Sequence, residues 1–117
     1  MLVYKILREN EFLHLESCGK TLGSPQDIRD GYIHLSKAEQ VEGTLNKHFK
    51  GEKKLILIAL ETKFLGSSLR WEKGNTKETY PHFYGQVNFN MASWISPIEF
   101  NGEDFIVPAG LKNGKIF

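Results

Sequence analysis

The chain has 117 residues, of which 40% are hydrophobic and 25% are charged, and its formal net charge is +1 at pH 7. A chain of this length can bury a core without disulfides or metals, and this composition excludes intrinsic disorder. The near-neutral balance, with lysines and arginines spread along the chain, excludes the broad basic surface of a protein that binds duplex nucleic acid. We therefore expect one globular domain spanning residues 1–117.

Cysteine content and hydropathy indicate the compartment. Cys18 is the only cysteine, so no internal disulfide can form, which fits a reducing environment. The first residues include Lys5 and Arg8 and no apolar signal-peptide core. The longest wholly apolar run, residues 55–60, is far too short to cross a bilayer. We expect a cytoplasmic protein without a membrane partner.

The first part of the chain predicts a strand followed by helices. Residues 2–7 mix aliphatic and aromatic side chains and predict a strand, and residues 9–17 change to a helical period. Ser24, followed by Pro25, is typical of the cap and first turn of a very short helix.

Ser36 predicts the start of the best-defined helix. With Glu39 it forms a capping-box pattern, in which the two side chains bond to backbone amides of the first turn. Apolar residues then share one helical face: Ala38, Val41, Leu45 and Phe49. The aliphatic run over residues 54–61 is typical of a central strand that is covered on both faces.

The rest of the chain predicts mainly strands. Their residue types and flanking turn residues place them at 69–72, 81–89, 93–100 and 103–107. The tail, residues 110–117, has an irregular pattern. Helices early and strands late indicate an α+β domain, with two main helices and a curved, mostly antiparallel, split sheet.

The clearest functional pattern lies in residues 30–36, which predict a turn and then a short strand. Side chains alternate across a strand, so Ile33 and Leu35 share an apolar face. The opposite face carries a phenol, an imidazole and a hydroxyl, which belong to Tyr32, His34 and Ser36.

Two later strands repeat this division into an apolar and a polar face. In residues 69–72 the apolar face carries Leu69 and Trp71, and we expect Trp71 in the core. The polar faces of the two strands carry Arg70, Glu72, His82, Tyr84 and Gln86. If all three polar faces converge, they form a cleft with two imidazoles, a carboxylate, a guanidinium group and phenol rings.

A solvated surface gives the same alternation, because antiparallel sheets often have one polar, solvent-facing side. Composition favours a site, since such surfaces are normally rich in Lys, Glu and Thr, whereas His, Tyr and Gln orient ligands. A metal site is not expected, because Cys18 has no partner and the histidines have no paired ligand spacing: His14, His34, His48 and His82.

Three segments carry a resemblance to a known family: Asp30-Gly31-Tyr32-Ile33-His34-Leu35-Ser36, Leu69-Arg70-Trp71-Glu72 and Pro81-His82-Phe83-Tyr84-Gly85. In this order they resemble a small bacterial family catalogued as domain of unknown function 952, over residues 1–100. That family is similar to the ADP-ribosyltransferase fold, so the resemblance implies a split, curved β structure with a nicotinamide-dinucleotide cleft. Residues 33–36 are also similar to a segment of the RNA 2′-phosphotransferases, which use that fold.

The polar residues and the resemblance together lead to the hypothesis of an enzyme that cleaves a glycosidic or phosphoester bond of NAD or a related nucleotide. NAD would be a substrate, and no cofactor is required. In this hypothesis His34 binds ribose hydroxyls, and Glu72 stabilises positive charge at the anomeric carbon. His82 acts as an acid or base, which an imidazole can do near neutral pH.

The same hypothesis assigns ligand contacts to residues around these three. Tyr32 and Tyr84 would stack on a ring of the ligand, and Arg70 and Arg29 would pair with phosphate oxygens. Ser36 and Gln86 would supply further polar contacts.

Two other functions stay open. A non-catalytic module could use the same cleft to bind a small anion or nucleotide. A structural or partner-binding protein would need none of these residues for its function.

Overall fold

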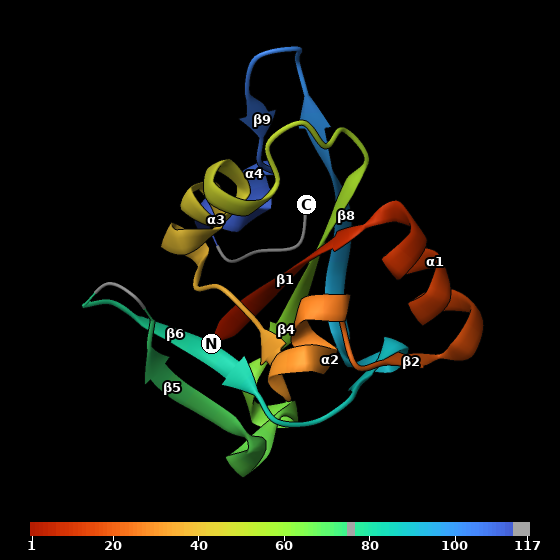
Figure 1. Cartoon of the computed structure of the whole chain (residues 1–117), viewed down its shortest axis with the longest axis vertical. Coiled ribbons are helices and arrows are strands. Elements are labelled where there is room, and N and C mark those ends of the chain that lie inside the picture. Colours follow the sequence, from red (N-terminus) through yellow and green to blue (C-terminus); the bar gives the residue numbers. More distant parts are fainter. Residues whose placement is uncertain (75–76, 114–117) are drawn as a thin grey trace.

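The computed structural model describes residues 1–74 and 77–113, which form short helices and antiparallel strands (Figure 1). The helices are α1 (Glu9–Cys18), α2 (Pro25–Asp30), α3 (Val41–His48) and α4 (Ala109–Asn113). Short 3-10 turns lie at Ala38–Gln40, Thr62–Phe64, Gly66–Ser68 and Phe89–Met91. The strands are β1 (Leu2–Arg8), β2 (Lys20–Thr21), β3 (Ile33–His34), β4 (Leu55–Glu61), β5 (Leu69–Lys73), β6 (Thr79–Phe83), β7 (Val87–Asn88), β8 (Ala92–Phe100) and β9 (Phe105–Ile106).

The main sheet has the strand order β1-β4-β8-β9, with antiparallel pairing throughout. β4 lies inside this sheet, as its aliphatic run predicts. Leu57 and Ala59 face a core that includes Leu45 of α3, whereas Ile58 and Leu60 face a second core. The sheet therefore lies between two apolar layers, and this burial on both faces fixes its register.

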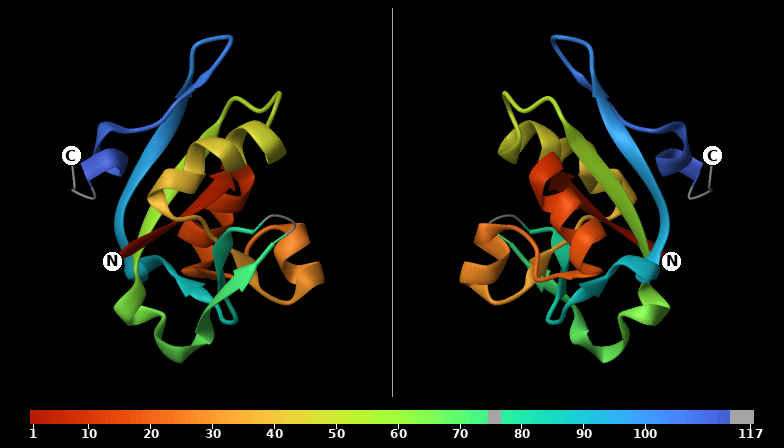
Figure 2. Two further views of the ribbon diagram at one scale, coloured as in Figure 1. Left: turned by 90° about the vertical axis from the view of Figure 1, so that its left-hand side faces the viewer. Right: turned by 90° about the vertical axis from the view of Figure 1, so that its right-hand side faces the viewer.

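A smaller sheet has the order β3-β6-β5, and β2 pairs with β7. The two larger sheets meet at an isolated bridge, where the backbones of Tyr4 and Ser36 exchange hydrogen bonds of 2.8 and 2.9 Å. After this bridge the two sheets diverge, and Figure 2 shows the strong curvature of β8. The structure confirms an α+β domain with a curled, antiparallel sheet.

The start of α3 differs from the prediction. Ser36 does not cap it, because the Ser36 backbone is engaged in the bridge to Tyr4. A 3-10 turn comes first, and the amide of Lys37 donates to Oε1 of Gln40 at 3.0 Å. The predicted apolar face is confirmed, since Val41, Leu45 and Phe49 are buried and Ala38 is partly buried against the same core.

Two predictions for the later strands are wrong. Residues 81–89 do not form one strand, because β6 ends at Phe83 and β7 begins at Val87. Trp71 is not in the core but 41% exposed. Leu69 packs against the second core, whereas Trp71, two residues further along the edge strand β5, lies beyond it.

The carboxyl-terminal segment also differs from the prediction. The sequence predicts an irregular segment over residues 110–117, but this segment begins within α4, where Leu111 is buried against the first core. Residues 114–117 lie outside the described residues. In the part of the chain that the structure describes, no helix is long and apolar enough to span a membrane.

Candidate functional site

β3 and β6 bring two histidines from distant parts of the chain together. His34 and His82 are directly opposite each other in the antiparallel register, and their ring centroids are 5.5 Å apart. On the other side of β6, Arg70 of β5 is opposite His82. The polar residues of all three strands therefore lie on one face of the smaller sheet.

Tyr32 lies at the centre of this face. Its ring stacks on His82 with a centroid distance of 4.3 Å, and it lies 4.6 Å from His34 and 5.0 Å from Tyr84. The guanidinium group of Arg70 lies 4.7 Å from the centre of the Tyr84 ring. Burial and nearby carboxylates raise the pKa of Tyr32, so its phenol is neutral at physiological pH.

Glu72 holds His82 from the neighbouring strand. An ionised carboxylate only accepts hydrogen bonds, so Nδ1 of His82 donates to Oε1 of Glu72, at 2.8 Å. The Tyr84 hydroxyl donates to the same oxygen at 2.7 Å. The hydrogen bond from Tyr84, and next that from His82, lower the pKa of Glu72. Nε2 of His82 has no hydrogen-bond partner among the described residues and is the ring atom left for a ligand.

Asp27 holds His34 in a similar way, but from a buried position. Asp27 is 2% exposed, and its Oδ1 accepts from Nδ1 of His34 at 2.6 Å. Its Oδ2 lies 2.7 Å from the ammonium group of Lys5 on β1. Burial acts to raise the pKa of Asp27, but the hydrogen bond from His34 and the charge of Lys5 outweigh it and lower the pKa to about 2. Asp27 is therefore ionised and fixes the orientation of the His34 ring.

The sequence before α2 shapes the space around Asp27. Ser24 is the cap of α2, as predicted: its hydroxyl accepts from the amide of Asp27, and its own amide donates to Oδ2 of Asp27 at 2.9 Å. Gly23 has a φ of 96°, and a Cβ atom at this position would collide with Oδ2 of Asp27. Only glycine fits here, for both reasons.

A cleft of about 940 Å³ lies between β1, α2, α3 and the β5–β6 hairpin. It follows the edge of β1 from Tyr4 to Arg8, where the two sheets diverge. Several residues predicted for the site line this cleft: Arg29, Tyr32, His34, Ser36 and His82. Others are not among the described lining residues: Arg70, Glu72, Tyr84 and Gln86.

These four residues have different positions. Glu72 accepts hydrogen bonds from His82 and from the Tyr84 hydroxyl. The guanidinium group of Arg70 lies over the Tyr84 ring. Gln86 lies in the turn between β6 and β7, because the strand predicted through it ends at Phe83.

One face of α3 forms the opposite wall of the cleft, with Gly43, Thr44, Lys47 and His48. The hydroxyl groups of Ser36 and Thr44 are 3.1 Å apart and share a hydrogen bond. Burial, followed by the charge of Lys47, lowers the pKa of His48, so its ring is mainly neutral at pH 7.

Sequence reasoning missed the pair that holds His34. Lys5 lies in a strand that the sequence predicts to be mostly apolar, and Asp27 lies in the short helix α2. Lys5 carried a usable signal, because a charged residue inside a buried strand needs an opposite charge nearby. The identity of that partner is a tertiary contact, between residues of β1 and α2.

Comparison with models of known protein families shows to which family the chain belongs. Residues 6–95 match the model of a family described as "Protein of unknown function (DUF952)". The chain belongs to the DUF952 family. The matched region contains His34 and His82 and the carboxylates that hold them. No protein with a curated description matches the sequence.

Solved structures of one protein, CC0527 from Caulobacter crescentus, are similar to this DUF952 chain. A crystal structure has a TM-score of 0.85 and 32% sequence identity, covering 90% of this chain and 92% of the other. A solution NMR structure has a TM-score of 0.80 and 31% identity, covering 96% and 95%. The curled α+β domain is therefore shared with an experimentally determined fold.

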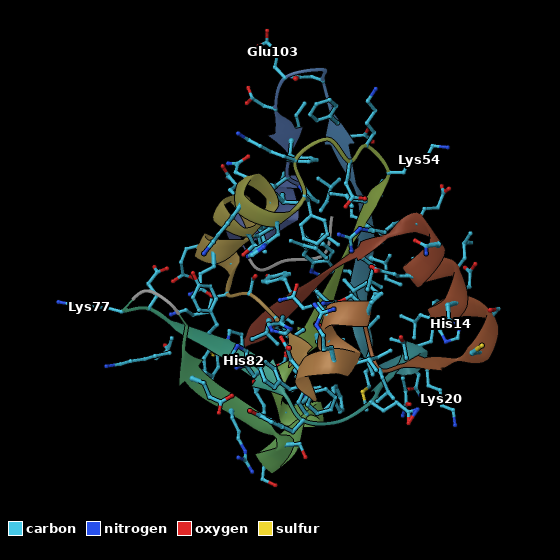
Figure 3. All side chains as sticks on the ribbon, viewed as in Figure 1. His14, Lys20, Lys54, Lys77, His82 and Glu103 are labelled. Atoms are coloured by element: carbon cyan, nitrogen blue, oxygen red, sulfur yellow. The ribbon has the colours of Figure 1, made fainter. Side chains whose placement is uncertain are left out.

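The chemistry that the DUF952 cleft offers is acid–base and polar. Within residues 1–74 and 77–113, no group of three or more His, Cys, Asp or Glu side chains is arranged to hold a metal ion. His14 lies on α1, well away from His82 (Figure 3). The cleft instead combines two carboxylate-bound imidazoles with cationic side chains, which suits proton transfer next to an anionic ligand.

Proposed function

We propose that this DUF952 protein binds NAD or a related nucleotide in the cleft and cleaves a glycosidic or phosphoester bond in it. The observation that carries the proposal is the position of His82. Its Nδ1 is held by Glu72 at 2.8 Å, its ring is packed under Tyr32, and the residue lines a cleft large enough for a nucleotide. A histidine oriented by a carboxylate is a suitable general acid or base.

Hydrolysis of the glycosidic bond needs water as its only other reactant. Water attacks the anomeric carbon and transfers a proton to Nε2 of His82. The bond from that carbon to the ring nitrogen breaks, and nicotinamide leaves as a neutral molecule. In this step Glu72 stabilises the imidazolium form of His82, because its carboxylate accepts the Nδ1 proton.

Cationic side chains in the cleft would bind the phosphate groups. Arg29, Lys47 and Lys73 line the cleft and have no ion-pair partner among the described residues. Their charges come from α2, α3 and β5, so they surround the space on three sides. In the proposal Tyr32 provides a ring surface for a base, while Arg70 and Tyr84 contribute at the rim.

The proposal also includes an ADP-ribosyltransferase-like fold, which the three sequence segments support by resemblance. NAD is then a substrate, and no resident cofactor is required. The single, exposed Cys18 is compatible with a cytoplasmic location.

One observation favours the second candidate, a non-catalytic module for a small nucleotide or anion. Glu72 is not among the residues that line the cleft, and its Oε1 is occupied by two hydrogen bonds. A carboxylate that must stabilise an oxocarbenium-like centre needs to face it. A binding module has no such requirement.

Incubation of the purified protein with NAD, followed by chromatographic analysis of nicotinamide and ADP-ribose, tests the proposal. We expect turnover by the wild type, its loss in His82→Asn, and at least a tenfold decrease in Glu72→Gln. His14→Asn is the matched control, since His14 is exposed on α1. Absence of both turnover and calorimetric binding would overturn the proposal. Equal binding by wild type and His82→Asn with no product from either would establish the binding module instead.

A further inference from the structure

His34 lies between two carboxylates. Its Nδ1 is 2.6 Å from Oδ1 of Asp27, and its Nε2 is 3.3 Å from Oδ2 of Asp30. Asp30 is the last residue of α2, and Gly31, with a φ of 86°, turns the chain directly into β3. The turn places Asp30 beside the His34 ring, although helix and strand run in different directions.

The two carboxylates differ in their access to a ligand. The side chain of Asp27 is 1% exposed, and its oxygens are bound by His34, Lys5 and the amide of Ser24. The side chain of Asp30 is 35% exposed and lines the cleft. Within this group of three residues, Asp30 and the Nε2 edge of His34 are therefore the parts that can meet a bound molecule.

The contact with Asp27 determines where the His34 ring carries its proton. A carboxylate accepts and cannot donate, so Nδ1 bears hydrogen. In the neutral ring Nε2 is then an acceptor, next to a second acceptor on Asp30. In the charged ring Nε2 becomes a donor. A ligand hydroxyl suits both states, because it can donate as well as accept.

We infer that Asp30 and Nε2 of His34 form a subsite for two neighbouring hydroxyl groups of a sugar ring, with Asp27 as the positioning residue. One hydroxyl donates to Asp30 and the other bonds Nε2 of His34. A phosphate is disfavoured at this position, since it would face the carboxylates of Asp30 and Asp27.

This inference rests on the proposed function and narrows its substrate. The nucleotide would carry a free vicinal diol, whereas 2′-deoxy and 2′-phosphorylated nucleotides would be rejected. Its phosphates would lie away from Asp30, toward cationic side chains of the cleft such as Lys47 and Lys73.

Titration calorimetry with two inert probes, AMP and 2′-deoxy-AMP, tests the subsite. We expect the wild type to bind AMP about tenfold more tightly, because a hydrogen bond to a charged group is lost in the deoxy compound. Asp30→Asn should weaken AMP binding to a similar degree and remove the discrimination. Asp104→Asn, an exposed carboxylate outside the cleft, is the matched control and should retain it. Equal binding of both probes by the wild type, or no binding of AMP at millimolar concentration, overturns the inference.

The positioning role of Asp27 is tested by the tautomer of the His34 ring, because an ion pair that only stabilised the fold would not determine which ring nitrogen carries hydrogen. Long-range ¹H–¹⁵N NMR spectra of His34 should show hydrogen on Nδ1 in the wild type and in Asp30→Asn. In Asp27→Asn we expect a mixture of both ring tautomers, because an amide can donate as well as accept. An unchanged tautomer in a folded Asp27→Asn protein contradicts the positioning role. If Asp27→Asn does not fold, hydrogen on Nε2 of the wild-type ring contradicts it equally.

Failure of the two proposals can be told apart. Tighter binding of AMP than of 2′-deoxy-AMP, without any turnover of NAD, would support the diol subsite and contradict the enzymatic function. Turnover of NAD and its deoxyribose analogue at equal rates would support the enzymatic function and contradict the diol subsite.

Discussion

His34 and His82 face each other across two adjacent strands, and each donates its Nδ1 proton to a carboxylate. The two carboxylates are not equivalent, because Asp27 is buried whereas the Glu72 side chain is 37% exposed. The His34 ring is therefore held by a carboxylate buried in the fold, whereas the His82 ring is held by a carboxylate that solvent can reach. This difference suits one imidazole for binding and the other for proton transfer.

Acid should weaken the fold through Asp27. The pKa of this group is lowered in the folded state from 3.8 to about 2. The unfolded chain takes up the proton first as the pH falls, so the folded state loses stability between about pH 4 and pH 2, by about 2 kcal/mol for this group. Urea unfolding measured across this range should show the loss in the wild type.

Asp27→Asn should remove the contribution of Asp27 to this pH dependence. At pH 7 the variant should be about 3 kcal/mol less stable, because Lys5 keeps a buried charge without its partner. Asp104→Asn serves as the control and should keep the wild-type slope. The same slope in Asp27→Asn would show that other carboxylates cause it.

Tyr84→Phe should raise the pKa of Glu72. The hydrogen bond from the Tyr84 hydroxyl is the largest cause of the lowered pKa, so its removal shifts the pKa back toward the ordinary value of a glutamate. A ¹³C NMR titration of the Glu72 carboxyl group measures the shift. In the control, Tyr80→Phe, the lost hydroxyl contacts Glu78 instead, and the pKa of Glu72 should not change.

Two glycine substitutions should have opposite effects on stability. Gly43 lies within α3, and a Cβ atom there meets no atom within 4 Å, so Gly43→Ala should stabilise the fold by about 1 kcal/mol. Gly23→Ala should destabilise it by about 3 kcal/mol, because Cβ collides with Asp27 at a left-handed φ. Thermal unfolding of the two variants measures the sign of each change in stability. Destabilisation by Gly43→Ala would mean that the α3 wall is packed more tightly than the structure shows.

Trp71→Ala should cost less than about 1 kcal/mol, because the indole is 41% exposed on an edge strand. Leu45→Ala is the contrasting variant, and it should cost about 3 kcal/mol because Leu45 is fully buried between α3 and the main sheet. Denaturant titrations give both values. A loss of stability in Trp71→Ala as large as that in Leu45→Ala would place the indole in a core after all.

Patterns that repeat within a few residues were sufficient for most of the fold. The aliphatic run predicted the interior strand β4, and apolar spacing predicted the buried face of α3, because each feature depends on near neighbours in the chain. The capping-box pattern at Ser36 was misleading for a nonlocal reason. The Ser36 backbone forms the bridge to Tyr4, and this long-range pairing excludes the cap.

The sequence by itself determined that Tyr32 and His34 share a polar face, because side-chain alternation follows from the geometry of any strand. It could not determine that Lys5 and Asp27 meet behind that face, or that Trp71 lies beyond the core. These outcomes depend on where distant elements pack, and the same local pattern is compatible with several packings. The cleft likewise exists only in the tertiary structure, because it lies where the two sheets separate after the isolated bridge between Tyr4 and Ser36.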